Sequence, residues 1–448
     1  MLVANKRAQS CRNYKEQITP GRVVAAGSQV RTTSKMPTDF ANIVDTIERD
    51  TMAASDILLI HPLLGKTDAW SGYLVDGELQ PGGSGEAIRC LIESQLLGKF
   101  NSQHPWLIQA NLLDPANHAL DQRIIPQFSA ADKPDGTNAK PQPETGFREA
   151  KRQLAVKVGP RDKLPATGAW DYLLIGVGHA RTLPPYSLLG LSSRTIVVAT
   201  DIQTHGDHHW AKENYCSLHT TEFLLTRVDK ADKADITRVK LLKILALIAA
   251  DADTASLDEV LRHESKLSYS LLRLVNSAAN ALRTPITSIS QAINLLGRRQ
   301  LQRWVQLLVY ADPNNAQQPN PLLQKAAARG RLMEILSSRV ALQQNIEILG
   351  DEAFMVGSFS LLDVLLHMSI GEVVQQLTLP DSVKMALLGH RGVLGQLLKL
   401  VIAAETRDTA LAASLLGNLP LSAAEHVEAQ LEALIWAEKV NVPGEAKN

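Results

Sequence analysis

The sequence has little cysteine, no net charge and no long apolar run, and each absence excludes a class of protein. Its three cysteines, Cys11, Cys90 and Cys216, are odd in number and far apart, which argues against a disulfide framework or a zinc knuckle and favours a reducing compartment. With 46 basic and 46 acidic residues, the chain has no general electrostatic reason to bind nucleic acid or an anionic membrane. No segment approaches the roughly 18 apolar residues that span a bilayer. We therefore expect a soluble cytoplasmic protein, with neither membrane nor nucleic acid among its partners.

The first half of the chain has the pattern of an α/β domain behind a disordered leader. Residues 1–53 are mostly polar and predict the leader. From 54 to 228, short apolar runs at 56–60, 106–110, 172–176 and 195–199 alternate with helical segments, which is typical of strands buried in a mainly parallel sheet. The proline-containing stretch 129–167 predicts a disordered insertion. About 135 residues then remain, well short of the 200 or more usual for an eight-stranded α/β barrel.

The second half has helical periodicity throughout. After a charged join at 229–235, apolar residues recur every three or four positions from 237 to 310. Capping boxes at Ser256–Glu259 and Ser288–Gln291 start two of these helices, and Gly297 ends one. Trp304 lies on an apolar stripe and is expected in the core. A helix follows at 322–341, another begins at Asp351–Glu352, and the C-terminal segment 409–448 predicts two further helices and a frayed end.

Two long strings in this half resemble a known family. LSYSLLRLVNSAANALRTPITSISQAINLLGRRQLQRWVQLLVYA, which begins at Leu267, and DEAFMVGSFSLLDVLLHMSIGEVVQQLTLPDSVKMALLGHRGVLGQLLKLVIAAE, which begins at Asp351, resemble the HDOD output domain. The version they resemble is the one joined to an EAL domain in bacterial signalling proteins. The resemblance covers 229–408 and implies an all-helical HDOD domain there.

The α/β half resembles an EAL domain in places only. Residues 60–63 and 70–75 are similar to the family's opening strand, turn and second strand, 109–112 to the strand with a metal-binding asparagine, and 171–176 and 199–204 to later strands. The resemblance puts the family's acidic and lysine positions on residues that are neutral here, and Asn111 alone is retained. Those neutral residues are Leu74, Val75, Leu174, Gly176, Thr200 and Gln203.

This replacement has a chemical consequence for the activity that the resemblance implies. In the EAL family, carboxylates hold two divalent cations that activate water for cyclic-di-GMP hydrolysis. Neutral side chains cannot replace such a cluster, so we expect no phosphodiesterase activity in this half and assign no catalytic, cofactor-binding or metal-binding residue.

The helical half resembles the fold of HD-type phosphohydrolases, and the second possible metal centre also lacks its ligands. The resemblance places the His-Asp pair of those enzymes at Ser360 and Leu361, neither of which binds metals well. Asp363 and His367 lie four residues apart nearby, and we interpret them as a surface or partly buried pair.

Three other clusters have two interpretations each. His205–His209 offers imidazoles and a carboxylate for a metal ion, but a solvated loop is the commoner arrangement. Pro81–Gly85 either presents backbone amides to a phosphate or forms a flexible turn. The basic residues Lys243, Arg298, Arg299 and Arg303 either contact phosphate or RNA or, more commonly, form a solvated face that pairs with acids.

We therefore predict an α/β plus all-α protein: a shortened, degenerate EAL-like domain derived from a TIM barrel at 54–228, followed by the helical HDOD domain. The predicted function is non-catalytic signal transduction, as a scaffold or relay in a cyclic-di-GMP-related bacterial pathway. Expected partners are regulatory proteins such as histidine kinases, diguanylate cyclases or motility regulators. The alternatives are a cyclic-di-GMP phosphodiesterase and a receptor that binds cyclic-di-GMP without cleaving it.

Overall fold

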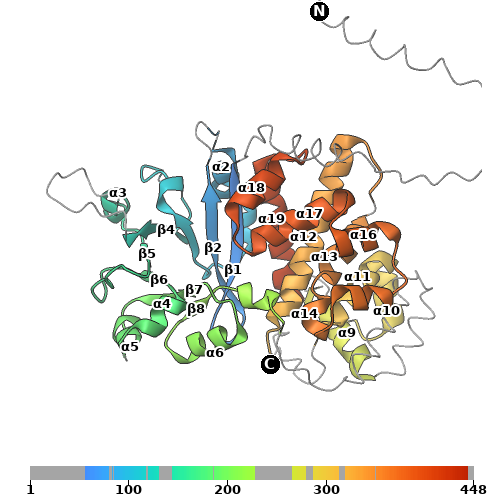
Figure 1. Cartoon of the computed structure of the whole chain (residues 1–448), viewed down its shortest axis with the longest axis horizontal. Helices are drawn as coiled ribbons and strands as arrows, with labels where there is room; N and C mark the ends of the chain where they lie inside the picture. Colours follow the sequence, from blue (N-terminus) through green and yellow to red (C-terminus); the bar gives the residue numbers. More distant parts are fainter. Residues whose placement is uncertain are drawn as a thin grey trace, which may run out of the picture. The chain divides into compact units, whose positions relative to one another are not determined.

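The structure, a computed structural model, describes residues 56–79, 83, 85–117, 120–130, 144–184, 186–227, 265–278, 286–311, 318–348 and 350–441. All of them belong to one compact unit, with strands in its first half and helices in its second (Figure 1). The predicted leader at 1–53, the join at 229–235 and the helices expected between 237 and 261 lie outside the described residues.

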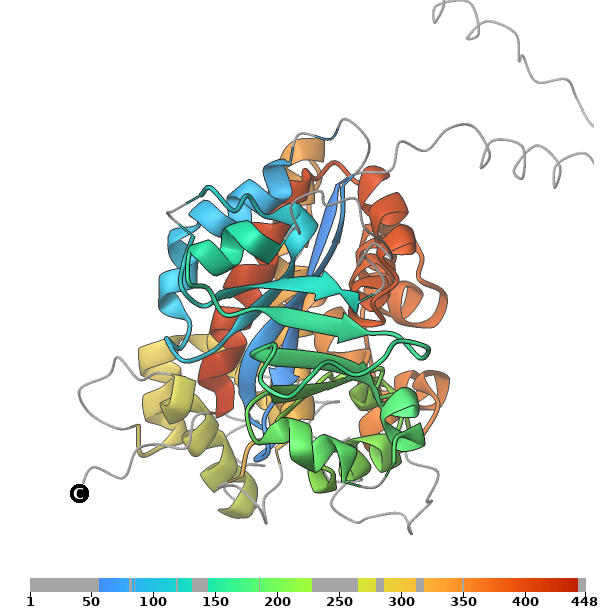
Figure 2. The same ribbon diagram turned by 90° about the vertical axis from the view of Figure 1, so that its left-hand side faces the viewer.

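The first half is a barrel of eight strands that closes in chain order, with the strands side by side in Figure 2. β1 is antiparallel to β2, the strands from β2 to β8 are parallel, and β1 meets β8 through the single pair Leu64 and His219. The strands are β1 (Ile57–Leu64), β2 (Trp70–Glu78), β3 (Trp106–Gln109), β4 (Ile124–Ser129), β5 (Ala155–Val158), β6 (Tyr172–Gly176), β7 (Ile196–Thr200) and β8 (Leu218–His219).

The length argument against an eight-stranded barrel was therefore wrong. The barrel closes with few residues because its connections are short. Its helices have six to nine residues each, and β1 reaches β2 directly through residues 65–69. These helices are α2 (Glu86–Glu93), α3 (Glu144–Glu149), α4 (Val177–Thr182), α5 (Ser187–Ser192) and α6 (His205–Glu213).

The predicted disordered insertion at 129–167 was also wrong for its second part. Residues 131–143 lie outside the described residues, but α3 and β5 both fall within the predicted insertion. Phe147 of α3 and Val156 of β5 are buried, so this segment does contribute to a core. A four-residue strand between proline-rich stretches is too short to show a clear period of two.

Side chains alternate between the inside and the outside of the barrel, as strands require. The residues that point inward form a separate apolar cluster in the barrel interior: Leu63, Leu74, Leu107, Ile125, Ala155, Tyr172, Leu174, Val198 and Leu218. The outward residues belong to the large core shared with the helices. The barrel interior is therefore filled by apolar side chains. Polar side chains that act together are expected only at the ends of the strands.

The second half is a layer of helices whose positions confirm the predicted helical periodicity. They are α9 (Ser265–Ala278), α10 (Ile289–Leu296), α11 (Arg298–Leu308), α12 (Pro321–Gln344), α13 (Gly350–Phe359), α14 (Leu362–Leu366), α15 (Ile370–Gln375), α16 (Asp381–Gly389), α17 (Gly392–Glu405), α18 (Thr409–Gly417) and α19 (Ala423–Glu438). Helix α10 ends at Gly297, whose φ is 77°, as expected. Trp304 is buried and stacks on Trp436, which confirms its place in the core.

Helices α12 and α13 cross at two glycines. A Cβ atom on Gly357 would lie 2.6 Å from the carbonyl oxygen of Arg329, and one on Gly330 would lie 3.0 Å from the ring of Phe354. Only glycine permits so close an approach of two helix backbones. This crossing fixes Arg329 next to the end of α13.

The two C-terminal helices pack on the preceding bundle as predicted, and α19 also packs on the barrel. The side chain of Gln430 accepts a hydrogen bond from the Ile60 N–H and donates one to the Leu58 carbonyl, both at 2.9 Å. The Tyr73 hydroxyl donates to Glu438 at 2.5 Å. Helix α19 thus covers β1, the strand that has no helix of its own directly after it.

One stretch, 381–405, is long and apolar enough by composition to cross a membrane. In the structure it is two helices, α16 and α17, separated by His390 and Arg391, and the inner face of α17 is buried in the helical core. Its apolar character is accounted for by this packing.

Candidate functional site

The carboxyl ends of the parallel strands surround a polar cavity of ≈ 440 Å³. This end of an α/β barrel is where loops and strand ends bring functional side chains together. Four acidic and two basic side chains line the cavity, together with Gly77 and polar residues from the strand ends and the helical layer. The charged residues are Asp76, Glu78, Asp201, Glu222, Lys157 and Arg407, and the polar ones are Gln109, Gln203, Thr406 and Thr409.

Strand periodicity explains three of these positions. Asp76, Gln109 and Lys157 each lie two residues beyond an inward-pointing residue, which are Leu74, Leu107 and Ala155 respectively. A step of two returns a side chain to the same face of the sheet, one layer nearer the strand end. The barrel therefore changes from an apolar interior to a polar mouth within one layer.

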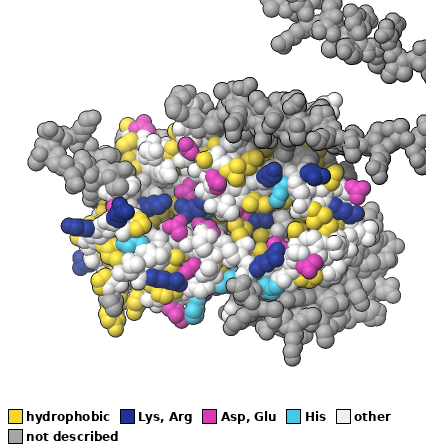
Figure 3. Space-filling model, viewed as in Figure 1, with side chains coloured by type: hydrophobic (Ala, Val, Ile, Leu, Met, Phe, Trp, Pro, Cys, Tyr) yellow, Lys and Arg dark blue, Asp and Glu magenta, His cyan; other side chains and the backbone are white. Residues whose placement is uncertain are grey.

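Arg407 enters this mouth from the helical layer. Its Nε lies 2.6 Å from Oδ2 of Asp76, and its NH1 group lies 3.3 Å from Oε1 of Glu222 and 3.8 Å from Oδ1 of Asp201. Asp76 belongs to β2, Asp201 follows β7 and Glu222 follows β8, so the guanidinium joins three separate parts of the barrel. Figure 3 shows acidic and basic side chains mixed over the middle of the face where strands and helices meet.

The charges of the mouth stabilise one another. Burial alone would lower the pKa of Arg407, but Asp76, Glu222 and Asp201 raise it above its ordinary value. Burial alone would raise the pKa of Asp76, but Arg407, with His61 and Lys157, lowers it. Both groups therefore stay ionised at neutral pH. His61 lies 3.5 Å from Asp76, yet burial lowers its pKa to about 4, so its imidazole is neutral there.

The residues singled out by the EAL resemblance are divided between the mouth and other parts of the barrel. Leu74 and Leu174 fill the barrel interior, Val75 points outward, and Gln203 lines the cavity. Asn111 is exposed on the short 3-10 helix η2 (Ala110–Leu112) and does not line the cavity, where Gln109 takes its place.

Gly176 and Thr200 stand at the ends of neighbouring strands and both make room for Asp201. A Cβ atom on Gly176 would lie 2.8 Å from Oδ2 of Asp201, and the Thr200 hydroxyl lies 3.3 Å from the same oxygen. The mouth nevertheless contains four acidic side chains, which are Asp76, Glu78, Asp201 and Glu222. The acids come from positions that the resemblance does not mark.

Within the described residues, no group of three or more His, Cys, Asp or Glu side chains is arranged to hold a metal ion. The carboxylates of the mouth instead converge on the guanidinium of Arg407. A signal for Asp76 was available, since it lies in phase with Leu74 on β2. Nothing local marks Glu222 or Arg407 as members of the same site.

The position of the second possible metal centre, around Ser360, also contains an arginine. NH1 of Arg329 donates to Oγ of Ser360 at 2.7 Å, and the rest of the guanidinium pairs with Glu405, while Lys325 lies 3.5 Å from the same carboxylate. Burial lowers the pKa of Lys325, whereas Arg329 and Lys325 hold the pKa of Glu405 low against its own burial. Leu361 is buried in the core.

The neighbouring Asp363 pairs with a residue of the barrel segment. It forms an ion pair with Arg227 at 2.9 Å. His367, expected to pair with it, ends α14 in a left-handed conformation. This ion pair ties Asp363 to the end of the barrel segment.

The histidine cluster His205–His209 is the first turn of α6, so its interpretation as a solvated loop was wrong. The Thr204 hydroxyl accepts from the N–H of Asp207 and the Asp207 carboxylate accepts from the N–H of Thr204. This capping box was readable in the sequence. His208 pairs with Asp68 at 3.1 Å and His209 with Glu213 at 3.2 Å.

The arginines at the start of α11 pair with acids, as the commoner interpretation predicted. Arg303 pairs with Glu334 and lies 3.1 Å from Asp351, and Arg299 lies 3.4 Å from Asp351. Lys243 and the side chain of Arg298 lie outside the described residues. Gly85 of the glycine-rich stretch has a φ of 61° and precedes α2, where its N–H donates to Asp56 at 3.3 Å, as a turn requires.

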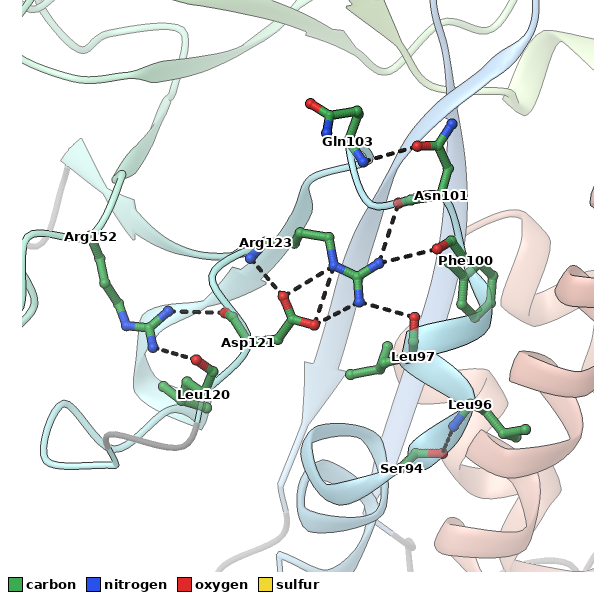
Figure 4. Close-up of polar contacts among 10 residues, drawn as sticks. All are labelled: Ser94, Leu96, Leu97, Phe100, Asn101, Gln103, Leu120, Asp121, Arg123 and Arg152. Carbon is green, nitrogen blue, oxygen red and sulfur yellow. Dashed lines mark hydrogen bonds and ion pairs between the residues drawn. The ribbon is translucent and has the colours of Figure 1, made fainter.

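The opposite end of the barrel is tied by a structural cluster (Figure 4). Arg123, just before β4, pairs with Asp121 at 2.6 Å and donates to the carbonyls of Leu97, Phe100 and Asn101. Such bonds to backbone carbonyls hold loops in place. This end therefore serves stability, and the polar mouth remains the candidate functional site.

Comparison with known proteins identifies the helical half. The model of the HDOD domain family matches residues 238–390. YuxH of Bacillus subtilis is 36% identical over 182 residues, which is 40% of this chain and 42% of that protein. The cyclic di-GMP phosphodiesterase CdgJ of Vibrio cholerae is 33% identical over 158 residues, which is 35% of each. The chain thus spans less than half the length of each of these relatives.

Among solved structures, the Bacillus subtilis YkuI protein, which has an EAL domain and was crystallised with c-di-GMP and calcium, is similar over 57% of this chain and 74% of its own. The identity is 15% and the TM-score 0.29. The family match confirms the HDOD resemblance within the predicted range, and residues 238–390 of this chain are an HDOD domain.

Proposed function

We propose that this protein is a non-catalytic signal-transduction protein that holds regulatory proteins together, or relays a signal between them, in a cyclic-di-GMP-related bacterial pathway. The HDOD domain and the name of the relative CdgJ support the pathway. The barrel and the bundle share a core through α19, which supports a protein whose two halves act together.

One observation carries the non-catalytic part of the proposal: the guanidinium of Arg407 lies among Asp76, Asp201 and Glu222. Hydrolysis of a phosphodiester by two metal ions needs carboxylates free to hold those ions, which activate water and neutralise the phosphoryl oxygens. Here the carboxylates hold the guanidinium of Arg407, which cannot coordinate a water molecule and activate it as a metal ion does. The neutral side chains of Thr200 and Gln203 add no ligand charge.

The direct test is a hydrolysis assay on cyclic-di-GMP with Mg²⁺ or Mn²⁺, with CdgJ as the positive control. We expect no turnover by the full chain under conditions in which CdgJ is active. Turnover that Asp76→Asn or Glu222→Gln abolished, in a variant with an unchanged circular dichroism spectrum, would contradict the proposal.

A second candidate, a receptor that binds the dinucleotide without cleaving it, is favoured by one feature of the mouth. The cavity is large and polar, and Lys157 is exposed at its edge. Such a lysine suits a phosphate group as a point charge. Saturable micromolar binding of cyclic-di-GMP in calorimetry, lost in Lys157→Ala, would establish this function in place of the first.

The proposed partners are regulatory proteins of the cytoplasm, such as histidine kinases, diguanylate cyclases or motility regulators. The full chain should serve as bait in a cross-linking experiment, because α19 packs on both halves and a truncated bait would expose buried surface. Recovery of none of these classes, with a functional bait, would contradict the proposal.

A further inference from the structure

The corner between α17 and α18 has a backbone that its sequence does not favour. The N–H of Arg407 donates to the carbonyl of Ala404 and the N–H of Asp408 to that of Ala403, which is the Schellman ending of a helix. Arg407 takes the left-handed position of this motif, with a φ of 62°, where glycine is usual. An arginine is less favourable there than a glycine, and the contacts of its side chain offset that cost.

Those contacts are the carboxylates of the barrel mouth. Asp76 binds the guanidinium by two hydrogen bonds, through Nε at 2.6 Å and NH2 at 3.3 Å, and Glu222 by a third. Only 13% of the side chain is exposed. A cation buried to this degree stays charged because neighbouring carboxylates compensate its charge, and those carboxylates stay charged because of the cation.

Without Arg407 the mouth would be strongly acidic. Asp76, Glu78, Asp201 and Glu222 would then face Lys157 as the remaining basic residue of the lining. Oε2 of Glu222 is already buried without a hydrogen-bond partner among the described residues, so one acceptor is available even with the arginine in place. The arginine and a small cation would compete for the same oxygens.

The same corner is anchored on its other side. Glu405, two residues before Arg407, points into the helical layer, where Arg329 and Lys325 hold it. The last turn of α17 thus presents an acid to the bundle and a base to the barrel. Movement of Arg407 out of the mouth would pull directly on the segment that carries Glu405.

We propose that Arg407 is a plug: an internal cation that closes the barrel mouth, and whose withdrawal at the α17–α18 corner opens the mouth to a divalent cation. The plug is independent of whether the mouth takes a nucleotide, and so goes beyond the proposed function. Its closed state is the arrangement seen in the structure.

Titration of the full chain with Mn²⁺ by calorimetry tests this. Arg407→Gln should bind Mn²⁺ at least about tenfold more tightly than the unaltered chain, a difference of about 1.4 kcal/mol. The double variant R407Q/E222Q should lose this gain. Arg339→Gln is the matched control, since Arg339 is also ion-paired, with Glu428 and Glu432, but lies in the helical layer. It should bind like the unaltered chain.

A folded R407Q that bound Mn²⁺ no more tightly than R339Q would overturn the proposal. If R407Q does not fold, Arg407→Lys decides instead. Lysine keeps the positive charge but cannot make the paired hydrogen bonds to Asp76, so it should hold the mouth less firmly. Mn²⁺ affinity above that of the unaltered chain is then the expected result, and equal affinity would overturn the proposal.

Discussion

The buried side chain of Gln430 replaces a missing strand neighbour, and its removal should destabilise the whole protein. β1 pairs with β2 along one edge, but with β8 through a single residue pair on the other. On that second edge, the Gln430 amide supplies an acceptor to the Ile60 N–H and a donor to the Leu58 carbonyl. An amide side chain in this position imitates the peptide group of an adjacent strand.

The expected cost follows from the two backbone groups left without partners. In Gln430→Leu, the side chain keeps a similar volume, so the packing change is small and the hydrogen bonds are lost. Each buried backbone group without a partner costs about 1–3 kcal/mol, so the free energy of unfolding should fall by about 2–6 kcal/mol. Gln343→Leu is the control, because Gln343 is exposed and its side chain bonds to the side chain of Glu425. It should change stability by less than about 0.5 kcal/mol.

Urea unfolding followed by circular dichroism measures both variants, and hydrogen exchange at the Ile60 amide reports on the strand itself. We expect faster exchange at Ile60 in Gln430→Leu and not in Gln343→Leu. If the two variants proved equally stable, or if the Ile60 amide exchanged at the same rate in both, the argument that Gln430 completes the edge of β1 would be refuted.

Three further perturbations test other parts of the structure. Burial lowers the pKa of His61, His219 and His426 from 6.5 to about 4, so the unfolded chain takes up protons first as the pH falls below about 6.5. Each histidine should therefore lower the free energy of unfolding by about 2 kcal/mol at pH 5. The urea midpoint should be lower at pH 5 than at pH 7, and an unchanged midpoint would contradict this. Asp68→Asn should lower the free energy of unfolding by about 1 kcal/mol and speed hydrogen exchange in β8, because Asp68 pairs with Lys212 at 2.8 Å near the weak contact of β1 with β8. Hydrogen exchange no faster than in the parent chain would argue against such a role. Arg329→Met should cost about 3–5 kcal/mol in thermal or urea unfolding, since it leaves Glu405 buried without its main partner. A variant as stable as the parent chain would rule this out.

The sequence predicted the strands whose apolar runs were continuous. β3, β6 and β7 were located to within a residue or two, because a strand buried on both faces is apolar throughout. β8 has two residues and β5 four, so neither could show a period. Because those two strands were not recognised, the sequence did not show that the barrel closes. The argument from chain length, which was used instead, led to the wrong conclusion.

The site was only half readable from the sequence. Marking positions by resemblance drew attention to neutral residues near the strand ends, and it gave no reason to inspect Asp76 or Asp201, which lie one or two residues away. Arg407 and Asp76 are 331 residues apart in the chain, and their contact depends on a left-handed backbone that no local pattern near Arg407 signals. Long-range ion pairs of this kind are invisible to periodicity.

Both centres that resemblance marks as metal sites contain an arginine paired with carboxylates, and one turn of helix links them. Arg329 occupies the centre near Ser360 and Arg407 the barrel mouth, and each is bound to an acid that would otherwise be buried without compensation. Glu405 and Arg407 stand two residues apart at the end of α17, so neither ion pair can be broken by a movement of that turn without straining the other. The end of α17 is therefore the shortest physical route by which a change at the barrel mouth would reach the helical layer, and an insertion that lengthened this turn should uncouple the two halves without removing either charge.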